Sequence, residues 1–227
     1  MKFKIKFILI ISIVSILILS IIIYKIYNLK NENKSLNKKI EDINKEFSYI
    51  LLSEIMKLGE ANFILSIIGK RMNKSIKGLN KLYQASIDGG EPINFHKKCD
   101  DIPNTLVLIK SEGERRFGGF TPIPWKSEGG FIEDKKNQTF VFSLDNKKIY
   151  NLKSIRYAVY HREVFGPCFG WKDIDIYRNP IEKYYLRSIP DDYDYNGDKH
   201  PLSESDISYN NGYMKALEYE VFEVLFD

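Results

Sequence analysis

An apolar run without a charged side chain, residues 7–24, follows the first six residues of the chain. As a helix, at ~1.5 Å per residue, this run reaches about the minimum length that crosses the hydrocarbon core of a bilayer. It exceeds the ~7–15 apolar residues of a secretory signal peptide, and no small-residue cleavage site follows it. We therefore expect residues 1–27 to form a single transmembrane anchor that contacts membrane lipid through residues 7–24.

A heptad pattern follows the apolar run. Its members alternate at steps of four and three: Leu29, Asn33, Leu36, Ile40, Ile43, Phe47 and Ile50. Apolar residues in these positions form the seam of a coiled coil, and one polar Asn in the seam fixes its register. About three heptads are marginal alone, but membrane anchoring raises the effective concentration. Residues 28–78 are thus predicted to be a helical stalk, which either forms a parallel homodimer or packs on its own domain.

Apolar residues keep a helical spacing through residues 51–87, with one break, before Asp88-Gly89-Gly90 and Pro92 end the helical half. From residue 105 the period becomes two, which predicts strands. The predicted strands are 105–110, 139–144, 155–160, 173–177 and 218–226.

Two of these strands carry further expectations. In 173–177, Ile174 and Ile176 are predicted to face the core, with Asp173 and Asp175 facing solvent. In the last strand the alternation changes phase after Val221, which predicts a β-bulge there.

Short strands separated by Gly, Pro, Asn and Asp are typical of an antiparallel sandwich. The predicted fold class is α+β and mainly β: an antiparallel β-sandwich with flanking helices, preceded by a transmembrane helix and a helical or coiled-coil stalk. The predicted boundaries are 1–27 for the anchor, 28–78 for the stalk and 79–227 for the domain.

Charge is distributed unevenly along the chain. Residues 1–50 hold nine Lys against four acidic residues, and residues 51–172 hold twenty Lys/Arg against thirteen. Residues 173–227 hold five against thirteen, a net charge of −8. The basic parts suit a position near anionic lipid or another acidic surface. No basic stripe interleaved with aromatic residues is present, so we do not expect nucleic-acid binding.

Orientation in the membrane depends on the lysines that flank the anchor. Lys2, Lys4, Lys6 and the α-amine precede it, whereas Lys25, Lys30, Lys34, Lys38 and Lys39 follow it. The positive-inside rule then favours a cytosolic C-terminal domain in a single-pass membrane protein. Sequons at Asn33, Asn73 and Asn137 would be glycosylated if the domain were luminal.

The two cysteines, Cys99 and Cys168, belong to neither a CxxC motif nor a dense framework, so free thiols in a reducing compartment are expected. His96-x-x-Cys99 has the residue types of a zinc site, but two further ligands would be needed, and His161 with Cys168 do not have a zinc spacing. A base near Cys99 would lower the pKa of its thiol, which keeps a nucleophilic or peroxide-sensing role open.

Two other motifs resemble ligand sites. Asp192-Tyr193-Asp194-Tyr195-Asn196-Gly197 fits the first half of a calcium loop, but Ser203 stands where a bidentate Glu is needed. An acidic solvated turn is the alternative. Gly118-Gly119 lies inside a strand pattern without a phosphate-loop spacing, so close backbone approach or a bulge is expected there.

Several segments, in order, resemble the TLDc family. Residues 95–125 (FHKKCDDIPNTLVLIKSEGERRFGGFTPIPW) are similar to its opening, and 139–144 (TFVFSL) to its next strand. Gly166-Pro167-Cys168-Phe169-Gly170 matches its G-P-x-F-G turn, DIDIY follows, and 218–224 (EYEVFEV) resembles its terminal strand. The chain departs from the family pattern over residues 180–205.

The resemblance implies a sandwich of antiparallel sheets with flanking helices. It also implies roles in oxidation resistance and in binding and regulating the vacuolar proton pump (V-ATPase) from the cytosolic side. The family has no established catalytic residues, so we expect a regulatory module that is not an enzyme and holds no cofactor or metal.

Three hypotheses follow for function. In the first, the module binds a protein partner through the Gly166–Gly170 loop and the C-terminal strand edge. In the second, Cys99 carries a thiol-based antioxidant activity. In the third, the chain is a structural membrane tether whose stalk dimerises. The candidate interaction or redox residues are Cys99, Gly166, Pro167, Phe169 and Gly170.

Overall fold

The computed structural model describes residues 2–171, 173–177, 185–187, 191–196, 202 and 213–227; for 2–16, 50, 185–187, 213 and 214 it describes the backbone alone. The chain divides into two compact units, Met1–Ser48 and Tyr49–Asp227. The second unit begins well before the predicted domain boundary at residue 79, because residues 49–78 already contribute to its core.

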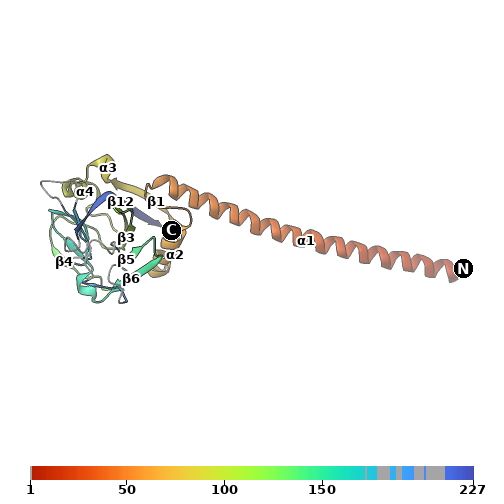
Figure 1. Cartoon of the computed structure of the whole chain (residues 1–227). Helices are drawn as coiled ribbons and strands as arrows, with labels where there is room; N and C mark the ends of the chain where they lie inside the picture. Colours follow the sequence, from red (N-terminus) through yellow and green to blue (C-terminus); the bar gives the residue numbers. More distant parts are fainter. Residues whose placement is uncertain (1, 172, 178–184, 188–190, 197–201, 203–212) are drawn as a thin grey trace. The chain divides into compact units, whose positions relative to one another are not determined.

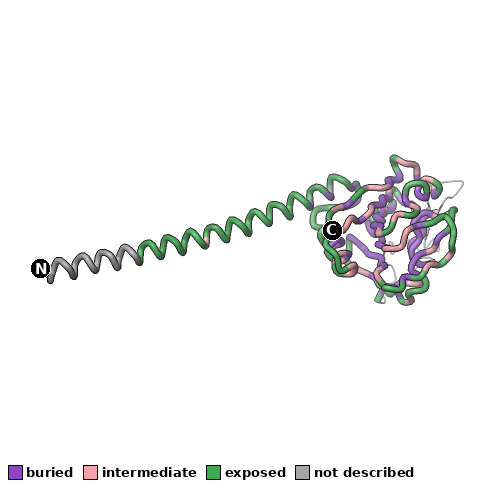
Figure 2. Tube along the Cα trace, turned by 180° about the vertical axis from the view of Figure 1, so that it is seen from behind, coloured by how far each residue is buried: buried purple, intermediate pink, exposed green. Residues whose placement is uncertain are grey.

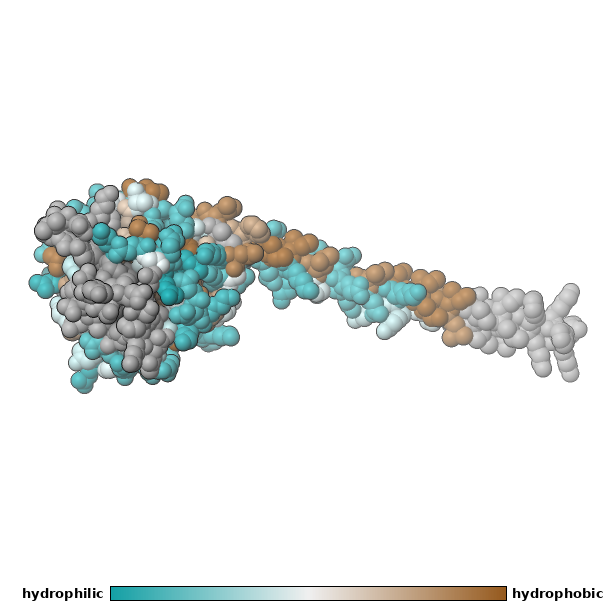
Figure 3. Space-filling view, in the orientation of Figure 1, coloured by the Kyte–Doolittle hydropathy of each residue, from teal (hydrophilic) through white to brown (hydrophobic). Residues whose placement is uncertain are grey.

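The helix α1 (Lys2–Leu52) runs without a break through the predicted anchor and the first half of the predicted stalk (Figure 1). Beyond residue 16 its residues are exposed almost throughout (Figure 2). The heptad residues Leu29, Leu36 and Ile43 are 60%, 54% and 54% exposed, and Ile40 and Phe47 are similar. Figure 3 shows apolar side chains gathered along this helix beside polar ones. The seam is therefore accessible to a partner, and its pairing stays a prediction.

Within the part of the chain that the structure describes, no helix has the length and apolar character needed to cross a membrane. The first ten residues of the predicted span, 7–16, lie outside the side chains that are described.

The second unit alternates few helices with many strands. Its helices after α1 are α2 (Glu60–Met72), α3 (Ala85–Asp88), α4 (Pro92–Cys99) and the 3-10 helix η1 (Ile155–Tyr157). Its strands are β1 (Ile76–Gln84), β2 (Thr105–Ser111), β3 (Arg116–Thr121), β4 (Gly130–Ile132), β5 (Phe140–Ser143), β6 (Lys148–Leu152), β7 (Val159–His161), β8 (Phe165–Phe169), β9 (Ile174–Tyr177), β10 (Tyr185–Arg187), β11 (Tyr193–Asp194) and β12 (Tyr213–Phe226).

All described strand pairs are antiparallel, in the order β11-β6-β5-β3-β2-β12-β10-β9-β8-β7-β4, and β1 also pairs with β12. The long strand β12 belongs to two sheets. Its start pairs with β10, and its remainder lies between β2 and β1. The first sheet holds β1, β12, β2, β3, β5, β6 and β11, and the second runs from β10 to β4. The predicted antiparallel α+β fold with flanking helices is confirmed.

Both faces of the first sheet are buried. Val107, Phe117 and Val141 point toward the second sheet and pack with Phe169 and Ile176 there. The alternate residues on the same strands point the other way and pack under α2. Those residues are Leu106, Leu108, Phe120, Phe140, Phe142 and Phe222, and α2 covers them with Ala61, Ile64, Leu65 and Ile68. The first sheet therefore forms the middle layer of the domain.

The glycines of β3 lie where its neighbours come closest. A Cβ on Gly118 would lie 1.9 Å from the carbonyl oxygen of Val107, and one on Gly119 would lie 2.5 Å from the ring of Phe169. Neither distance leaves room for a carbon atom, which confirms the predicted close approach.

Two predicted elements are wrong. The helical pattern through residues 51–87 fails at β1, because α2 ends where Asn73 takes a left-handed conformation (φ 52°) and residues 76–84 then pair with β12. The strand predicted at 155–160 begins with η1, whose first turn is capped by the Ser154 side chain accepting from the N–H of Arg156. β7 starts only at Val159.

The bulge predicted at Val221 is also wrong. Glu220, Val221 and Phe222 pair in unbroken register with β2, and the irregularity lies opposite them, in β1 between Lys81 and Tyr83. The change of phase has another cause. β12 is buried on both faces, so Tyr219 and Val221 fill one core and Phe222 and Val224 fill the other.

The solvent-facing positions assigned to Asp173 and Asp175 are wrong too, since both are fully buried. The carboxylate of Asp173 accepts hydrogen bonds from the backbone N–H groups of Asp191, Asp192 and Tyr193, at 2.8–3.2 Å. Asp173 thus holds residues 191–193, at the start of β11, in place. The three hydrogen bonds offset the cost of burying the carboxylate.

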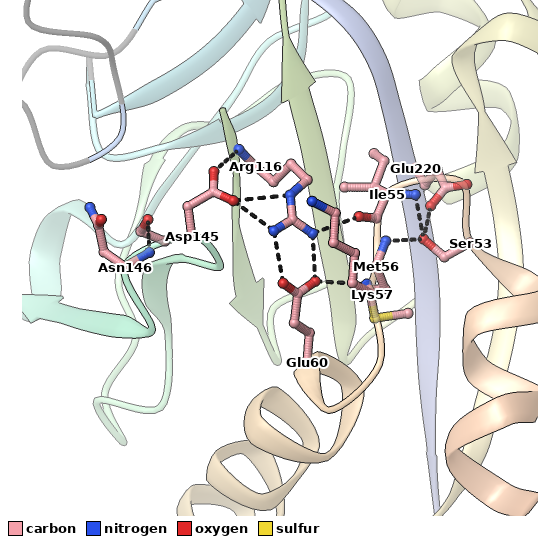
Figure 4. Close-up of polar contacts among 10 residues, drawn as sticks. Ser53, Ile55, Met56, Lys57, Glu60, Arg116, Asp145, Asn146 and Glu220 are labelled. Carbon is pink, nitrogen blue, oxygen red and sulfur yellow. Dashed lines mark hydrogen bonds and ion pairs between the residues drawn. The ribbon is translucent and has the colours of Figure 1, made fainter. Parts of the chain in front are cut away.

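A buried arginine ties α2 and the segment before it to the first sheet (Figure 4). The guanidinium of Arg116 donates to both carboxylate oxygens of Glu60 at 2.7 and 2.8 Å, to Asp145 at 2.6 Å and to the carbonyl of Ile55 at 3.2 Å. Glu60 in turn accepts from the N–H of Lys57 at 2.7 Å. Paired, two-pronged contacts of this kind are the strongest that an arginine makes with carboxylates.

A second polar cluster lies close by on β12. Glu220, which is fully buried, accepts from the hydroxyl of Ser53, the N–H of Glu54 and the ammonium of Lys81. The Ser53 hydroxyl also accepts from the N–H groups of Ile55 and Met56. The segment between α1 and α2 is therefore fixed to the sheet at both of its ends.

Replacement of Arg116 tests this anchoring. Arg116→Met leaves Glu60 buried without its partner, so we expect the free energy of unfolding to fall by about 3–5 kcal/mol. Arg115→Met, the same change at the exposed neighbour, should alter it by less than about 0.5 kcal/mol. Urea titration of the full chain in mild detergent, followed by tryptophan fluorescence, measures both. Equal effects of the two substitutions would contradict the anchoring role.

Candidate functional site

A pocket of about 660 Å³ opens at the end of the second sheet. The C-terminal end of α4, the loop before β4 and the strand β7 with the turn after it form its walls. Its lining residues are Asp100, Asp101, Lys126, Ser127, Glu128, Gly129, Gly130, Tyr160, His161, Arg162 and Glu163. The walls meet because Gly130 pairs with His161 across β4 and β7, and because Asp100 bridges to Trp125.

His96 holds two of these walls together. Its Nδ1 lies 2.7 Å from a carboxylate oxygen of Asp100, and its Nε2 lies 2.8 Å from the carbonyl oxygen of Phe165 and 3.1 Å from that of Arg162. All of these partners are oxygen atoms, and together they join the end of α4 to the turn after β7 through the imidazole ring. The other oxygen of Asp100 accepts from the hydroxyl of Ser127 at 2.8 Å. The helix end, the loop and the turn are thereby fixed around the pocket.

His161 differs from His96 in having no such partners. It is 3% exposed, and neither of its ring nitrogens makes a hydrogen bond to any described residue. A buried polar atom without a partner costs about 1–3 kcal/mol. The imidazole lies beside the ring of Trp125, with centroids 6.0 Å apart, and beneath Gly129. Burial lowers the pKa of His161 to about 4, against a smaller opposing effect of Asp100, so the ring is neutral near pH 7.

The lining carries more negative than positive charge. Four carboxylates, those of Asp100, Asp101, Glu128 and Glu163, stand against two cations, Lys126 and Arg162. The one ion pair among them joins Lys126 to Asp101 at 3.7 Å, and both partners are exposed. The pocket is therefore suited to a polar or positively charged group rather than to an apolar one.

A row of aromatic side chains lies on the outer face of the second sheet beside the pocket. The ring of Phe131 lies 4.9 Å from Tyr157, 4.9 Å from Tyr160 and 5.6 Å from Trp171. Phe131 and Tyr157 remain 40% and 39% exposed. β4, which carries Phe131, is the last strand in the described order. Exposed aromatic residues beside an edge strand are typical of protein-binding surfaces.

The cysteines lie away from this surface. Cys99 is fully buried and Cys168 is 1% exposed. Burial raises the pKa of the Cys99 thiol far above its usual range, with the charges of Asp100 and Asp88 adding to the effect. Such a thiol holds little thiolate at neutral pH and gives peroxide no direct access.

The predicted contact loop, Gly166–Gly170, is not on the surface. Its first four residues belong to β8, and all five are buried. Phe169 packs against Trp125 at 5.5 Å and fills the space opposite Gly119. The C-terminal strand edge proposed beside it is also occupied, since β12 has strands on both sides. In the structure these residues are part of the domain core.

The metal motifs are not assembled in the described residues. Both nitrogens of His96 are already engaged, and the described part of the chain holds no group of three His, Cys, Asp or Glu suited to a metal. In the calcium motif, Asp192 accepts from the N–H of Trp171 and Asp194 from that of Asn196. Residues 197–201 and 203 of that motif lie outside the described residues.

The buried state of His161 has a measurable consequence. With a folded pKa of about 4 against about 6.5 in the unfolded chain, only the unfolded chain binds this proton between those values, so unfolding becomes easier as pH falls through this window. His161→Phe lacks the group. Its free energy of unfolding, relative to wild type, should therefore rise by about 3 kcal/mol between about pH 7 and about pH 4. Urea titrations across this range measure it, and a constant difference would contradict a neutral buried ring.

Comparison with known proteins identifies the family. Residues 49–224 match the TLDc domain, which covers the second compact unit almost from end to end. A search of curated proteins found no match to the chain. The match begins at the residue where the compact unit begins and includes α2, which the sequence analysis had placed in the stalk. The chain belongs to the TLDc domain family.

Proposed function

We propose that this chain is a membrane-anchored regulatory module that binds a protein partner and is not an enzyme. The TLDc domain at residues 49–224 supports a regulatory or protein-binding role in general. The V-ATPase is the partner that the family resemblance favours, with a role in oxidative-stress resistance as the associated process. The domain is then expected on the cytosolic side, where the catalytic sector of the pump is accessible.

The observation that carries the proposal is the surface around β4. A compact, well-packed domain presents there an exposed aromatic row, an edge strand and an adjoining charged pocket. Binding surfaces combine such aromatic anchors with a polar rim. The buried thiols of Cys99 and Cys168 favour this role over a thiol-based antioxidant activity.

Membrane anchoring rests on the apolar run at residues 7–24. It lies within the continuous helix α1, and lysines stand on either side of it. Described residues of this run, such as Leu17, Leu19 and Ile23, are more than half exposed along the helix. Apolar side chains in that position are stabilised by lipid.

Capture of the pump tests the proposal. The full chain in mild detergent should bind the purified catalytic sector of the V-ATPase and change its rate of ATP hydrolysis. The test variant carries Phe131→Ser and Tyr157→Ser, which removes the exposed part of the aromatic row and should weaken capture by about tenfold or more. Capture that is absent, or that this double variant leaves unchanged, would contradict the proposed surface.

Topology is tested separately by protease protection in sealed membranes. A cytosolic domain should be digested and should lack glycans. Asn73 and Asn137 are both exposed, so a luminal domain would be protected and would shift in a glycosidase assay. That result would exclude regulation of the pump from the cytosol.

The exposed heptad seam supports a homodimer as the membrane-bound form. Ile40→Asp together with Phe47→Asp places two charges in the seam and should convert the dimer to a monomer, because buried unpaired charges are costly. Ser35→Asp together with Ser48→Asp adds the same charge at exposed positions outside the seam and should leave the dimer intact. Sedimentation in detergent measures both. A wild-type monomer at all concentrations would refute the dimer.

A further inference from the structure

The pocket contains a polar group that its own surroundings leave unsatisfied. His161 is 3% exposed, lines the pocket, and makes no hydrogen bond to a described residue with either nitrogen. The other buried histidine, His96, has every hydrogen-bonding position filled. His161 therefore offers an unused hydrogen-bonding nitrogen to a ligand in this pocket.

The charges around His161 indicate which kind of ligand fits. A neutral imidazole offers one nitrogen that accepts a hydrogen bond. Asp100, Glu128 and Glu163 add carboxylate acceptors on the same walls. A cation with several N–H groups satisfies all of these together, whereas a carboxylate or phosphate would meet a net negative lining. A planar guanidinium offers five N–H donors in a fixed fork, which reach several carboxylates at once better than the three donors of an ammonium.

The edge strand indicates how that cation is presented. β4 is the last strand of the described order, and its far side has no described strand. Gly130 in β4 carries no side chain, and a Cβ there would have no atom within 4 Å, so the face of the strand that lines the pocket is open. An extended segment that pairs along β4 would continue the sheet, as in other cases of strand addition.

The two faces of β4 and β7 set the pattern of such a segment. Gly130 and His161 pair on the pocket side, and Phe131 and Tyr160 pair on the aromatic side. Successive side chains of a strand point to opposite faces. One side chain of the added strand would thus enter the pocket while its two neighbours cover the aromatic row.

We infer that this pocket docks an arginine side chain from an extended segment of a partner protein, which adds to the second sheet along β4 and places apolar neighbours on Phe131 and Tyr160. The inference rests on the proposed role as a protein-binding module, but not on the identity of the partner. Both tryptophans of the chain report on it, because Trp125 lies beside His161 and Trp171 lies in the aromatic row.

Peptide titration tests this docking. The probe is acetyl-Thr-Val-Arg-Val-Thr-amide, added to the full chain in mild detergent and followed by tryptophan fluorescence and calorimetry. The comparison peptide carries citrulline in place of arginine, which keeps the shape and removes the charge. We expect the arginine peptide to bind at least about tenfold more tightly.

Variants then locate the interaction. Glu128→Gln with Glu163→Gln should weaken the arginine peptide by about tenfold and leave the citrulline peptide unchanged. Glu114→Gln, at an exposed carboxylate outside the pocket, is the matched control and should change neither. His161→Phe should remove the preference for arginine, with the melting temperature of the variant measured alongside to establish that it is folded.

Several results would overturn the inference. These are equal affinity for the two peptides, tighter binding of a peptide with glutamate at the central position, or no binding at millimolar concentration. Any of these three results would overturn the arginine-docking inference, even if the chain captures the proton pump. Arginine-selective binding that depends on Glu128 and Glu163 would support the inference even if the pump is not captured, so the two proposals fail independently.

Discussion

The contact between Arg116 and Glu60 joins two layers of the domain, the helix α2 and the first sheet. α2 carries the side chains that cover one face of the first sheet, and no hydrogen-bond ladder fixes its position. Hydrophobic contact alone is non-directional. The two-pronged pair, with Asp145 and the Ile55 carbonyl on the remaining N–H groups, sets where the helix begins over the sheet. The pair of Arg116 and Glu60 is buried, so removal of either side chain would leave the other charge without a partner inside the protein.

This anchoring explains why the family match begins at residue 49 and not at the first strand. The first sheet is apolar on both faces, so it requires a cover on the side away from the second sheet. The segment from Tyr49 to Met72 supplies that cover, and Glu220 and Arg116 fix it to the sheet between α1 and the start of α2. A domain cut at residue 79 would expose Leu106, Phe140 and Phe222 to water. The helical layer is therefore an integral part of the fold.

The sequence predicted the middle of the sheet well and its borders poorly. The continuous apolar run in β2 identified a strand buried on both faces, and Gly118-Gly119 correctly indicated close approach. β1 was missed because Ile76, Leu79 and Tyr83 are spaced by three and four, as in a helix. In the structure a bulge between Lys81 and Tyr83 places Leu79 and Tyr83 in opposite cores. That register depends on β12, which begins at Tyr213, far along the chain from the end of β1 at Gln84.

The candidate site could not be predicted, for a related reason. His96 and Cys99 drew attention because they are close in sequence, yet His96 serves to hold a wall and Cys99 packs in the core. His161 has no sequence neighbour that suggests a ligand. Only the pairing of β4 with β7, and the approach of α4 to the turn after β7, leave its ring without partners inside a charged pocket.

The position of β12 also affects how the domain forms during synthesis. This strand pairs with β2, β1 and β10, so the middle of the first sheet stays incomplete until residues 213–226 have left the ribosome. Contacts between such distant segments form slowly, because a long loop must close first. The nascent chain therefore exposes unpaired edges of β1 and β2 through most of its translation, a state that aggregates easily and in which chaperones bind polypeptides.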